Sequence, residues 1–263
     1  MSRVDQALVA RGLAPSRTAA QRLIADGAVR IAPGVRIDRP SQQVSEFDEL
    51  WVGPSDETRY VSRAGAKLEH ALRDTGIDPH GLTVLDLGMS TGGFADCLLQ
   101  AGASQVIGIE VGHGQLHELL RLDPRITCLE RTNLRDMNRT ELLARVPHAP
   151  PAGCAMAVAD LSFISLTKVV SAIDALLAPD AIALLLVKPQ FELGAAALDR
   201  RGIVADASRA REAVDAVASA CTALGWTVQG IVDSAVPGTD GNREFFLHAR
   251  TATAGSRPNR ITA

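Results

Sequence analysis

The sequence has few cysteines and no long apolar run. Its four cysteines include no pair spaced like a CxxC metal site, and 263 residues are too many to need disulfide staples, so we expect reduced thiols and no metal site. The longest apolar run, residues 181–187, is far shorter than the ~20 residues of a membrane-spanning helix. The first residues contain no apolar signal core. These absences predict a cytoplasmic protein with no membrane partner.

Aromatic residues are also scarce, at 3% of the chain, so its core must consist mostly of Ala, Val, Leu and Ile. The hydrophobic fraction of 46% and charged fraction of 22% are ordinary for a globular protein. A net charge of −3 gives no overall positive field that would attract nucleic acid. RNA binding would therefore need locally concentrated basic residues.

Lysine is nearly absent, since only Lys67, Lys168 and Lys188 occur among the 27 Lys and Arg residues. In a chain that otherwise uses arginine, each lysine invites a functional explanation, because an amine can lose its proton where a guanidinium cannot. The alternative is that these three simply survived drift.

The first 59 residues favour a small α+β module. Apolar spacing predicts one helix ended by Gly12 and a second helix capped by Ser16 and ended by Gly27. Short strands are expected at 29–31, 35–37 and 50–52.

Positive charge is concentrated in this module. Residues 1–43 contain seven arginines against three aspartates, a local charge of +4. Arg17 lies in the first turn of its helix, where the dipole disfavours a cation. This placement indicates either a functional residue or an exposed arginine that costs little stability.

After a plausible linker at 53–57, apolar runs of strand length alternate with helical stretches, which is typical of a doubly wound parallel sheet. Strands are expected at 83–87, 105–110, 155–160, 182–187 and 227–232, and helices at 94–101, 166–177 and 209–224.

The last run, 243–249, follows the preceding strand with no room for a crossover helix, so it should be antiparallel. A mostly parallel seven-stranded α/β sheet with one late antiparallel strand is the class I (Rossmann-like) methyltransferase arrangement rather than that of a dehydrogenase. The polar residues 251–263 are expected to form a flexible tail.

The strongest local motif is VLDLGMSTGGF at residues 84–94, where a buried strand meets a glycine-rich turn and a helix. The turn does not match the GxGxxG of a dinucleotide site, and it lacks the lysine of a P-loop. Asp86, just before the turn, suits a cationic methionyl amine better than a phosphate. The alternative is a plain tight turn between strand and helix.

Three further charged residues end predicted strands. Glu110 is placed to accept hydrogen bonds from ribose hydroxyls, and Asp160 and Lys188 follow two later strands. Because ligands bind at the carboxyl ends of strands in such sheets, these residues should converge with Asp86 on one crevice. Each alone could be a capping or ion-pair residue.

Together these segments resemble the TlyA (hemolysin A-like) family of ribosomal RNA 2′-O-methyltransferases, which have an N-terminal S4 domain and an FtsJ-like catalytic domain. The resemblance covers nearly the whole chain and is carried by VDQALVARGLAPSRTAAQRLI, SRAGAKL, DLGMSTGGF, GHGQL, DPRI, ERTN, DLSFISL, LVKPQFE and GNREF. It implies an S4-like RNA-binding domain with linker at 1–59 and a methyltransferase domain at 60–250.

The resemblance also implies a reaction: methyl transfer from S-adenosylmethionine to a cytidine ribose 2′-hydroxyl, with ribosomal RNA or ribosomal subunits as partner. The family's catalytic tetrad maps onto Lys67, Asp160, Lys188 and Glu244. Lys188 would be the general base, favoured by the nearby charge of Lys67, with both carboxylates orienting the amines. Lys168 lies outside the tetrad.

The remaining expected site residues fall into two groups. Cofactor-binding residues would be Asp86, Gly88, Ser90, Thr91, Gly92, Gly93, Phe94, Glu110, Asn133 and Asp160. RNA-binding residues would be Arg3, Arg11, Arg17, Arg22, Arg30, Arg36 and Arg63.

Three residues depart from the family pattern: Met89 in the glycine turn, His117 at a position where aromatics are common, and Ala195 in place of a basic residue. Two other functions stay open, a non-catalytic RNA-binding or ribosome-assembly factor and a membrane-active hemolysin. The intact tetrad disfavours the first, and the lack of an apolar span disfavours the second. The oligomeric state is not indicated.

Overall fold

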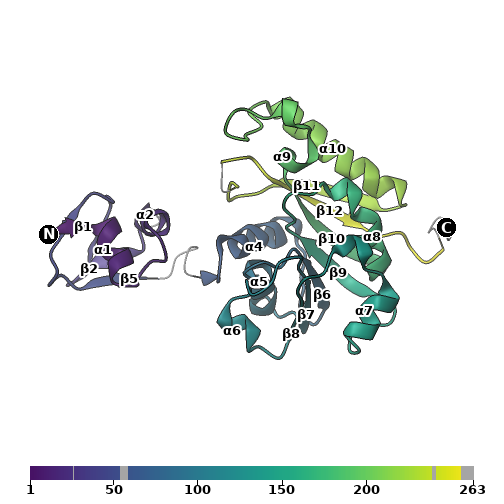
Figure 1. The fold of residues 1–263 in the computed structure, drawn as a ribbon, viewed down its shortest axis with the longest axis horizontal. Coiled ribbons are helices and arrows are strands. Elements are labelled where there is room, and N and C mark those ends of the chain that lie inside the picture. The colour runs from purple at the N-terminus through teal and green to yellow at the C-terminus, as the bar shows by residue number, and fades with distance from the viewer. Residues whose placement is uncertain (26, 54–58, 239–240, 256–263) are drawn as a thin grey trace. The chain divides into compact units, whose positions relative to one another are not determined.

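The structure is a computed structural model that describes residues 1–25, 27–53, 59–238 and 241–255 (Figure 1). The chain divides into two compact units, Met1–Ala66 and Lys67–Ala263. Apart from Gly53, the predicted linker lies outside the described residues. Within the described ranges, no helix has the length and apolar character needed to cross a membrane.

In the first unit, two helices pack together beside short antiparallel strands. The elements are β1 (Ser2–Arg3), α1 (Val4–Ala10), α2 (Arg17–Ala25), β2 (Val29–Ile31), β3 (Val35–Arg36), β4 (Gln43–Val44) and β5 (Leu50–Val52). The strands form a three-stranded sheet in the order β3-β2-β5 and a separate β1-β4 pair, which the sequence did not predict. The Ser16 hydroxyl accepts a hydrogen bond from the Ala19 N–H at 3.2 Å, so the predicted cap is confirmed.

The second unit is a seven-stranded sheet covered by helices on both faces (Figure 1). Its strands are β6 (Thr83–Leu87), β7 (Gln105–Ile109), β8 (Ile126–Leu129), β9 (Cys154–Ala159), β10 (Leu177–Val187), β11 (Thr227–Asp233) and β12 (Phe245–Arg250). Their order is β11-β12-β10-β9-β6-β7-β8. β12 runs antiparallel to both neighbours, and the other paired strands are parallel. The predicted α/β sheet with a late antiparallel strand is therefore confirmed.

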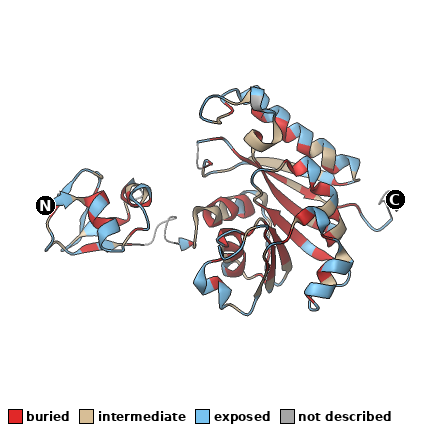
Figure 2. Cartoon of the chain, viewed as in Figure 1, coloured by how far each residue is buried: buried red, intermediate tan, exposed pale blue. Residues whose placement is uncertain are grey.

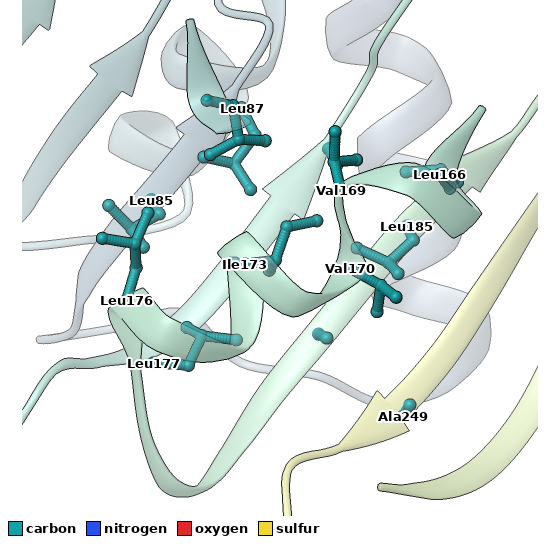
Figure 3. Close-up of a cluster of buried hydrophobic side chains, with 14 of the residues drawn as sticks. Leu85, Leu87, Leu166, Val169, Val170, Ile173, Leu176, Leu177, Leu185 and Ala249 are labelled. Carbon is teal, nitrogen blue, oxygen red and sulfur yellow. The ribbon is translucent and has the colours of Figure 1, made fainter. Parts of the chain in front are cut away.

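The helical elements are α4 (Arg63–Thr75), α5 (Gly93–Gln100), α6 (Glu118–Arg121), α7 (Arg139–Arg145), α8 (Val170–Leu176), α9 (Pro189–Glu192) and α10 (Ala207–Ala223), with short 3-10 turns η1 (Leu134–Asp136), η2 (Leu166–Lys168) and η3 (Ala195–Ala197). Alternate strand residues point to opposite faces of the sheet. Leu85 and Leu87 join Ile173 and Leu176 of α8 in one aliphatic core (Figure 3). Asp86, between the two leucines, therefore points to the other face.

Burial follows the sheet closely, because its central strands are covered on both faces while the outer faces of the helices are exposed (Figure 2). Strands β6, β7 and β9 are nearly continuous runs of buried aliphatic residues. Such runs are the expected consequence of a parallel sheet covered on both sides.

The fold differs from the sequence prediction in several places, among them the start of β10 at Leu177 instead of 182. β8 was missed because it is a short edge strand, only partly buried, with a weak apolar pattern. The helix expected at 166–177 is divided into η2 and α8. Thr251 is buried and its hydroxyl accepts a hydrogen bond from the Ala181 N–H at 2.9 Å, so the ordered fold extends into the expected flexible tail. The end of that tail, 256–263, is outside the described residues.

Candidate active site

The glycine-rich turn between β6 and α5 has a backbone that requires glycine. Gly88 has φ +85°, and a Cβ there would lie 2.7 Å from the carbonyl oxygen of Asp160. Gly92 has φ +93°, and its Cβ would lie 2.4 Å from a Leu120 methyl and 2.8 Å from a Leu116 methyl. Gly92 is thus needed for packing against two leucines, while Gly88 brings the turn against the loop that follows β9.

A cavity of about 560 Å³ opens at the carboxyl ends of β6, β7 and β9. Five of the predicted cofactor residues line it: Gly88, Ser90, Glu110, Asn133 and Asp160. Its wall also includes residues that sequence reasoning missed, among them Gln115, Thr132, Arg135, Leu161, Ser162 and Phe163. Most of these lie in loops after strands, where the sequence carries no periodic signal.

Asp86 of β6 is fully buried and is not among the residues that line this cavity, although Gly88, two positions later, is. Neither carboxylate oxygen of Asp86 has a hydrogen bond of good geometry among the described residues, although the backbone N–H of Ala95 lies close enough to favour the charged form. Burial, together with the negative charges of Asp160 and Glu110, raises the pKa of Asp86 to about 8. A buried carboxyl with few hydrogen-bond partners is costly, so Asp86 is suited to a cationic group.

Glu110 is held by the glycine turn and the loop after β7. Its carboxylate accepts the N–H of Ser90 at 2.9 Å and the N–H of Gly112 at 2.7 Å. Two backbone donors fix the orientation of the carboxylate, which can accept further hydrogen bonds through its remaining lone pairs. Asn133, across the cavity, accepts the N–H of Arg135 at 3.1 Å and begins η1.

The four predicted tetrad residues form two buried or nearly buried ion pairs. Lys67 Nζ of α4 lies 2.6 Å from Glu244 Oε2, and Lys188 Nζ lies 2.6 Å from Asp160 Oδ1. The sheet brings the two ion pairs close together, because Val187 of β10 is directly opposite Phe245 of β12. Lys188 and Glu244 therefore occupy adjoining strand ends, and Asp160 links Lys188 to the cavity.

The segment after β9 and the segment after β10 contact each other at four successive positions along the chain. Lys188 reaches Asp160, and it also donates to Ser162 Oγ at 3.0 Å. The rings of Phe163 and Phe191 are 5.2 Å apart. Glu192 accepts from Ser165 Oγ at 2.5 Å and from the N–H of Leu166 at 2.8 Å. Sequence reasoning had given Glu192 no role.

Replacing Glu192 with glutamine should weaken S-adenosylmethionine binding about tenfold, because the loop that lines the cavity loses charge-assisted hydrogen bonds worth about 1.5–3 kcal/mol. The expected signature is a raised KM for the cofactor with an unchanged KM for RNA. Steady-state methyl-transfer kinetics check this.

The matched control for that variant is Glu212→Gln, on the exposed face of α10, where the glutamate pairs with Arg209. It should leave both KM values unchanged. Equal losses in both KM values for Glu192→Gln, or a collapse of its melting temperature, would assign the residue a general structural role instead.

Besides Asp86, four other expected cofactor residues do not line the cavity. Phe94 is buried, and its ring lies 6.0 Å from that of Phe246 in the core. The Thr91 carbonyl accepts the N–H of His117 at 3.2 Å. Gly92 and Gly93 begin α5 and are buried. We therefore assign these four residues to shaping the turn.

In the first unit, two of the expected RNA-binding arginines are held by a buried carboxylate. Asp5 is fully buried and pairs with Arg3 at 3.0 Å and Arg17 at 2.9 Å, while Gln21 donates to it at 3.0 Å. The Arg3 guanidinium, followed by Gln21 and Arg17, holds the pKa of Asp5 well below its usual range. The unusual position of Arg17 in its helix is thus explained by a structural ion pair.

Other expected RNA-binding arginines also have contacts within the fold. Arg11 hydrogen-bonds the carbonyls of Ser45, Glu46 and Asp48. Arg36 pairs with Asp38 at 2.8 Å, and Arg30 donates to the Gly34 carbonyl at 3.3 Å. Arg22 and Arg63 are partly exposed and have interactions as well.

The departures from the family pattern are accommodated locally. Met89 is buried and packs against Gly108, where a Cβ would fall 2.3 Å from its terminal methyl. His117 begins α6, its Nδ1 accepting the N–H of Leu119 at 3.3 Å. Ala195 begins η3, and its side chain lies outside the described residues.

Comparison with known proteins identifies the family. Residues 60–251 match the FtsJ-like methyltransferase family, and residues 2–50 match the S4 domain. The chain is 43% identical over 252 residues to the 16S/23S rRNA (cytidine-2′-O)-methyltransferase TlyA of Mycobacterium tuberculosis, covering 96% of this chain and 91% of that protein. It is 33% identical over 246 residues to hemolysin A of Brachyspira hyodysenteriae, covering 94% and 98%.

A solved structure agrees with this relationship. A protein from Streptococcus thermophilus that carries the name hemolysin has a TM-score of 0.71 and 34% identity, over 95% of this chain and 88% of that one. The similarity thus extends through both units. The chain belongs to the TlyA family of FtsJ-like, S-adenosylmethionine-dependent methyltransferases, with an S4 domain ahead of the catalytic domain.

Proposed function

We propose that the protein transfers a methyl group from S-adenosylmethionine to a cytidine ribose 2′-hydroxyl of ribosomal RNA. The observation that carries this proposal is the position of Asp160, which lines the cavity and also forms the 2.6 Å ion pair with Lys188. One carboxylate thus connects a cofactor-sized cavity with a lysine at the next strand end. The 43% identity to a 16S/23S rRNA (cytidine-2′-O)-methyltransferase supports the substrate.

The residues around the cavity fit the cofactor. Asp86 is a buried carboxyl with few hydrogen-bond partners among the described residues, and it would receive the methionyl ammonium. Glu110 is oriented by two backbone N–H groups, and it would accept from the ribose hydroxyls. When bound, S-adenosylmethionine supplies an electrophilic methyl group on its sulfonium sulfur.

The chain's own residues would prepare the oxygen that attacks. As a neutral amine, after releasing one ammonium proton to solvent, Lys188 would take the proton of the 2′-hydroxyl, with Asp160 and Ser162 holding its Nζ in place. The buried Lys67–Glu244 pair adds a second positive charge and a second carboxylate at the adjoining strand end. Because the substrate oxygen would be bound beside an oriented base, proximity would contribute to the rate as well.

The first unit would hold the RNA. Arg3, Arg11 and Arg17 make contacts within the unit but keep exposed surface. Such arginines can still contact phosphates, and their binding should depend on salt. A ribosomal RNA substrate would be met in the cytoplasm.

The proposed function is tested with ribosomal subunits from cells that lack this protein. Incubation with methyl-labelled S-adenosylmethionine should label ribosomal RNA, and the modified nucleotide should resist alkaline cleavage because its 2′-hydroxyl is blocked. Label on a base, or none on either subunit, would refute the proposal. Absence of label together with tight RNA binding would favour a ribosome-assembly factor.

A further inference from the structure

The three-stranded sheet of the first unit carries a row of three exposed side chains. Arg30 on β2 is directly opposite Arg36 on β3 and directly opposite Trp51 on β5. Directly opposed residues of antiparallel strands point to the same face, with Cβ atoms about 4.5–5.5 Å apart. All three are exposed, so two arginines and one tryptophan project from this face, with the Arg36 guanidinium over Gly27 and the Arg30 guanidinium donating to the Gly34 carbonyl.

The neighbouring row faces the other way. Ile31 is directly opposite Val35 and Leu50, and both Leu50 and Ile31 pack in or against the core of the first unit. The Arg36–Arg30–Trp51 row therefore lies on the outer face of the sheet. It has no share in the unit's apolar core.

Without a ligand, this row of side chains lowers the stability of the first unit. Like charges placed directly opposite each other destabilise a sheet, and Trp51 leaves 55% of its surface exposed in a chain with only two tryptophans. Arg36 is partly neutralised by Asp38, but both side chains are more than half exposed, so that ion pair is weak and can exchange for another anion. An anionic ligand with a flat apolar surface would relieve both costs.

We infer that the Arg36–Arg30–Trp51 row is a binding surface for unpaired RNA, on which one base stacks against Trp51 while the arginines contact the adjoining phosphates. Aromatic stacking platforms flanked by positive charge are the recurring means of binding single-stranded nucleic acid. The six-membered ring of Trp51 lies over Gly53, where a Cβ would fall 2.7 Å from it. The glycine lets the indole lie low against the strand instead of standing free.

The inference deepens the proposed function, because it names where the RNA substrate is gripped outside the catalytic unit. It concerns a part of the substrate that is unpaired. A protein partner docking on Trp51, or a surface tryptophan without a ligand, are the alternatives that the experiment must separate.

Intrinsic fluorescence provides a direct probe in the full-length protein. Trp226 is buried and donates from its indole N–H to Asp174 at 2.9 Å, so RNA cannot stack on it. Adding an unstructured oligoribonucleotide should quench the Trp51 component, and Trp51→Phe should abolish the quenching while retaining most of the affinity. Trp51→Ala should weaken binding of the oligonucleotide roughly 5–100-fold.

Two further variants separate stacking from charge. Arg30→Gln should weaken RNA binding and reduce the slope of log affinity against log salt by about one. Val35→Ala removes an exposed apolar group from the opposite row of the same sheet and should change nothing. A perfect RNA duplex should show no loss with Trp51→Ala, since its bases are already stacked.

Trp51→Ala within twofold of wild type for the oligonucleotide, unchanged fluorescence on binding, or equal losses for duplex and single strand would each overturn the inference. Melting curves of the full-length protein, followed by circular dichroism, confirm that the first unit is folded in every variant. If ribose methylation fails while fluorescence quenching persists, the proposed reaction is wrong and the RNA surface stands. If methylation succeeds without quenching, only the surface is wrong.

Discussion

Lys188→Arg is expected to lose about 10²–10⁴-fold in the rate of methyl transfer while binding S-adenosylmethionine nearly as well as the wild type. This is the usual loss when a general base is removed. Arginine keeps the positive charge and the length to reach Asp160, but its pKa above ~12 prevents it from accepting a proton. The measurement is single-turnover methyl transfer to ribosomal substrate across a range of pH.

The chain provides a matched control at the remaining lysine outside the tetrad. Lys168 is exposed at the end of η2, and Lys168→Arg should leave the rate unchanged. Cofactor affinity and melting temperature identify any Lys188 variant that is misfolded. A Lys188→Arg enzyme within a few-fold of wild type would show that Lys188 acts as a fixed positive charge and that another group removes the proton.

The fold could be predicted to a large extent because its signals are local. β6, β7 and β9 are buried aliphatic runs, and each is followed by a turn and a helical pattern. The antiparallel direction of β12 followed from chain length alone, since the 233–245 connection leaves no room for a crossover helix. β8 escaped because an edge strand that is partly exposed needs no strong apolar pattern.

The charged residues of the site could also be predicted from local signals in the sequence. Their contacts with one another could not be predicted in this way. Asp86, Asp160 and Lys188 end or follow buried strands, which is where parallel sheets place ligands. Glu192 and Ser165 meet only because two loops fold side by side, and no spacing in the sequence encodes that contact. Pairings of this kind depend on tertiary structure.

For the arginines of the first unit, the sequence suggested free RNA-binding side chains where the structure has ion pairs within the fold. The charge count over residues 1–43 correctly located a basic segment, yet it did not reveal that Asp5 would be buried and would bind both Arg3 and Arg17. A carboxylate near the start of a helix appears in the sequence as an ordinary surface acid. Its burial is decided by α1 and α2 packing together.

Asp86→Asn should bind S-adenosylmethionine about 10–100-fold more weakly than wild type at pH 7.5, because a charge-assisted contact to the ammonium contributes about 1.5–3 kcal/mol. The two proteins should also differ in pH dependence. The pKa of Asp86 in the cofactor-free protein is about 8, so binding to its charged form must release a proton at lower pH. Wild-type affinity should therefore rise up to about tenfold per unit between pH 5.5 and 7.5, while the asparagine variant stays flat.

The free energy of unfolding of the cofactor-free wild type should fall as pH rises, whereas its cofactor affinity should rise. This difference separates a binding role of Asp86 from a structural one. The folded pKa of about 8 lies above the unfolded value near 3.9, so this carboxyl's contribution is fully present below about pH 4 and is lost as pH rises through 8. The melting temperature of cofactor-free Asp86→Asn should therefore increase relative to that of the wild type as pH rises over that window.

Calorimetric titration in buffers of different ionisation enthalpy counts the protons released on cofactor binding, and Asp215→Asn on the exposed face of α10 is the control. Equal affinities and equal proton release for wild type and Asp86→Asn would remove Asp86 from the cofactor site, because a carboxyl that meets the ammonium cannot be replaced by a neutral amide without either change.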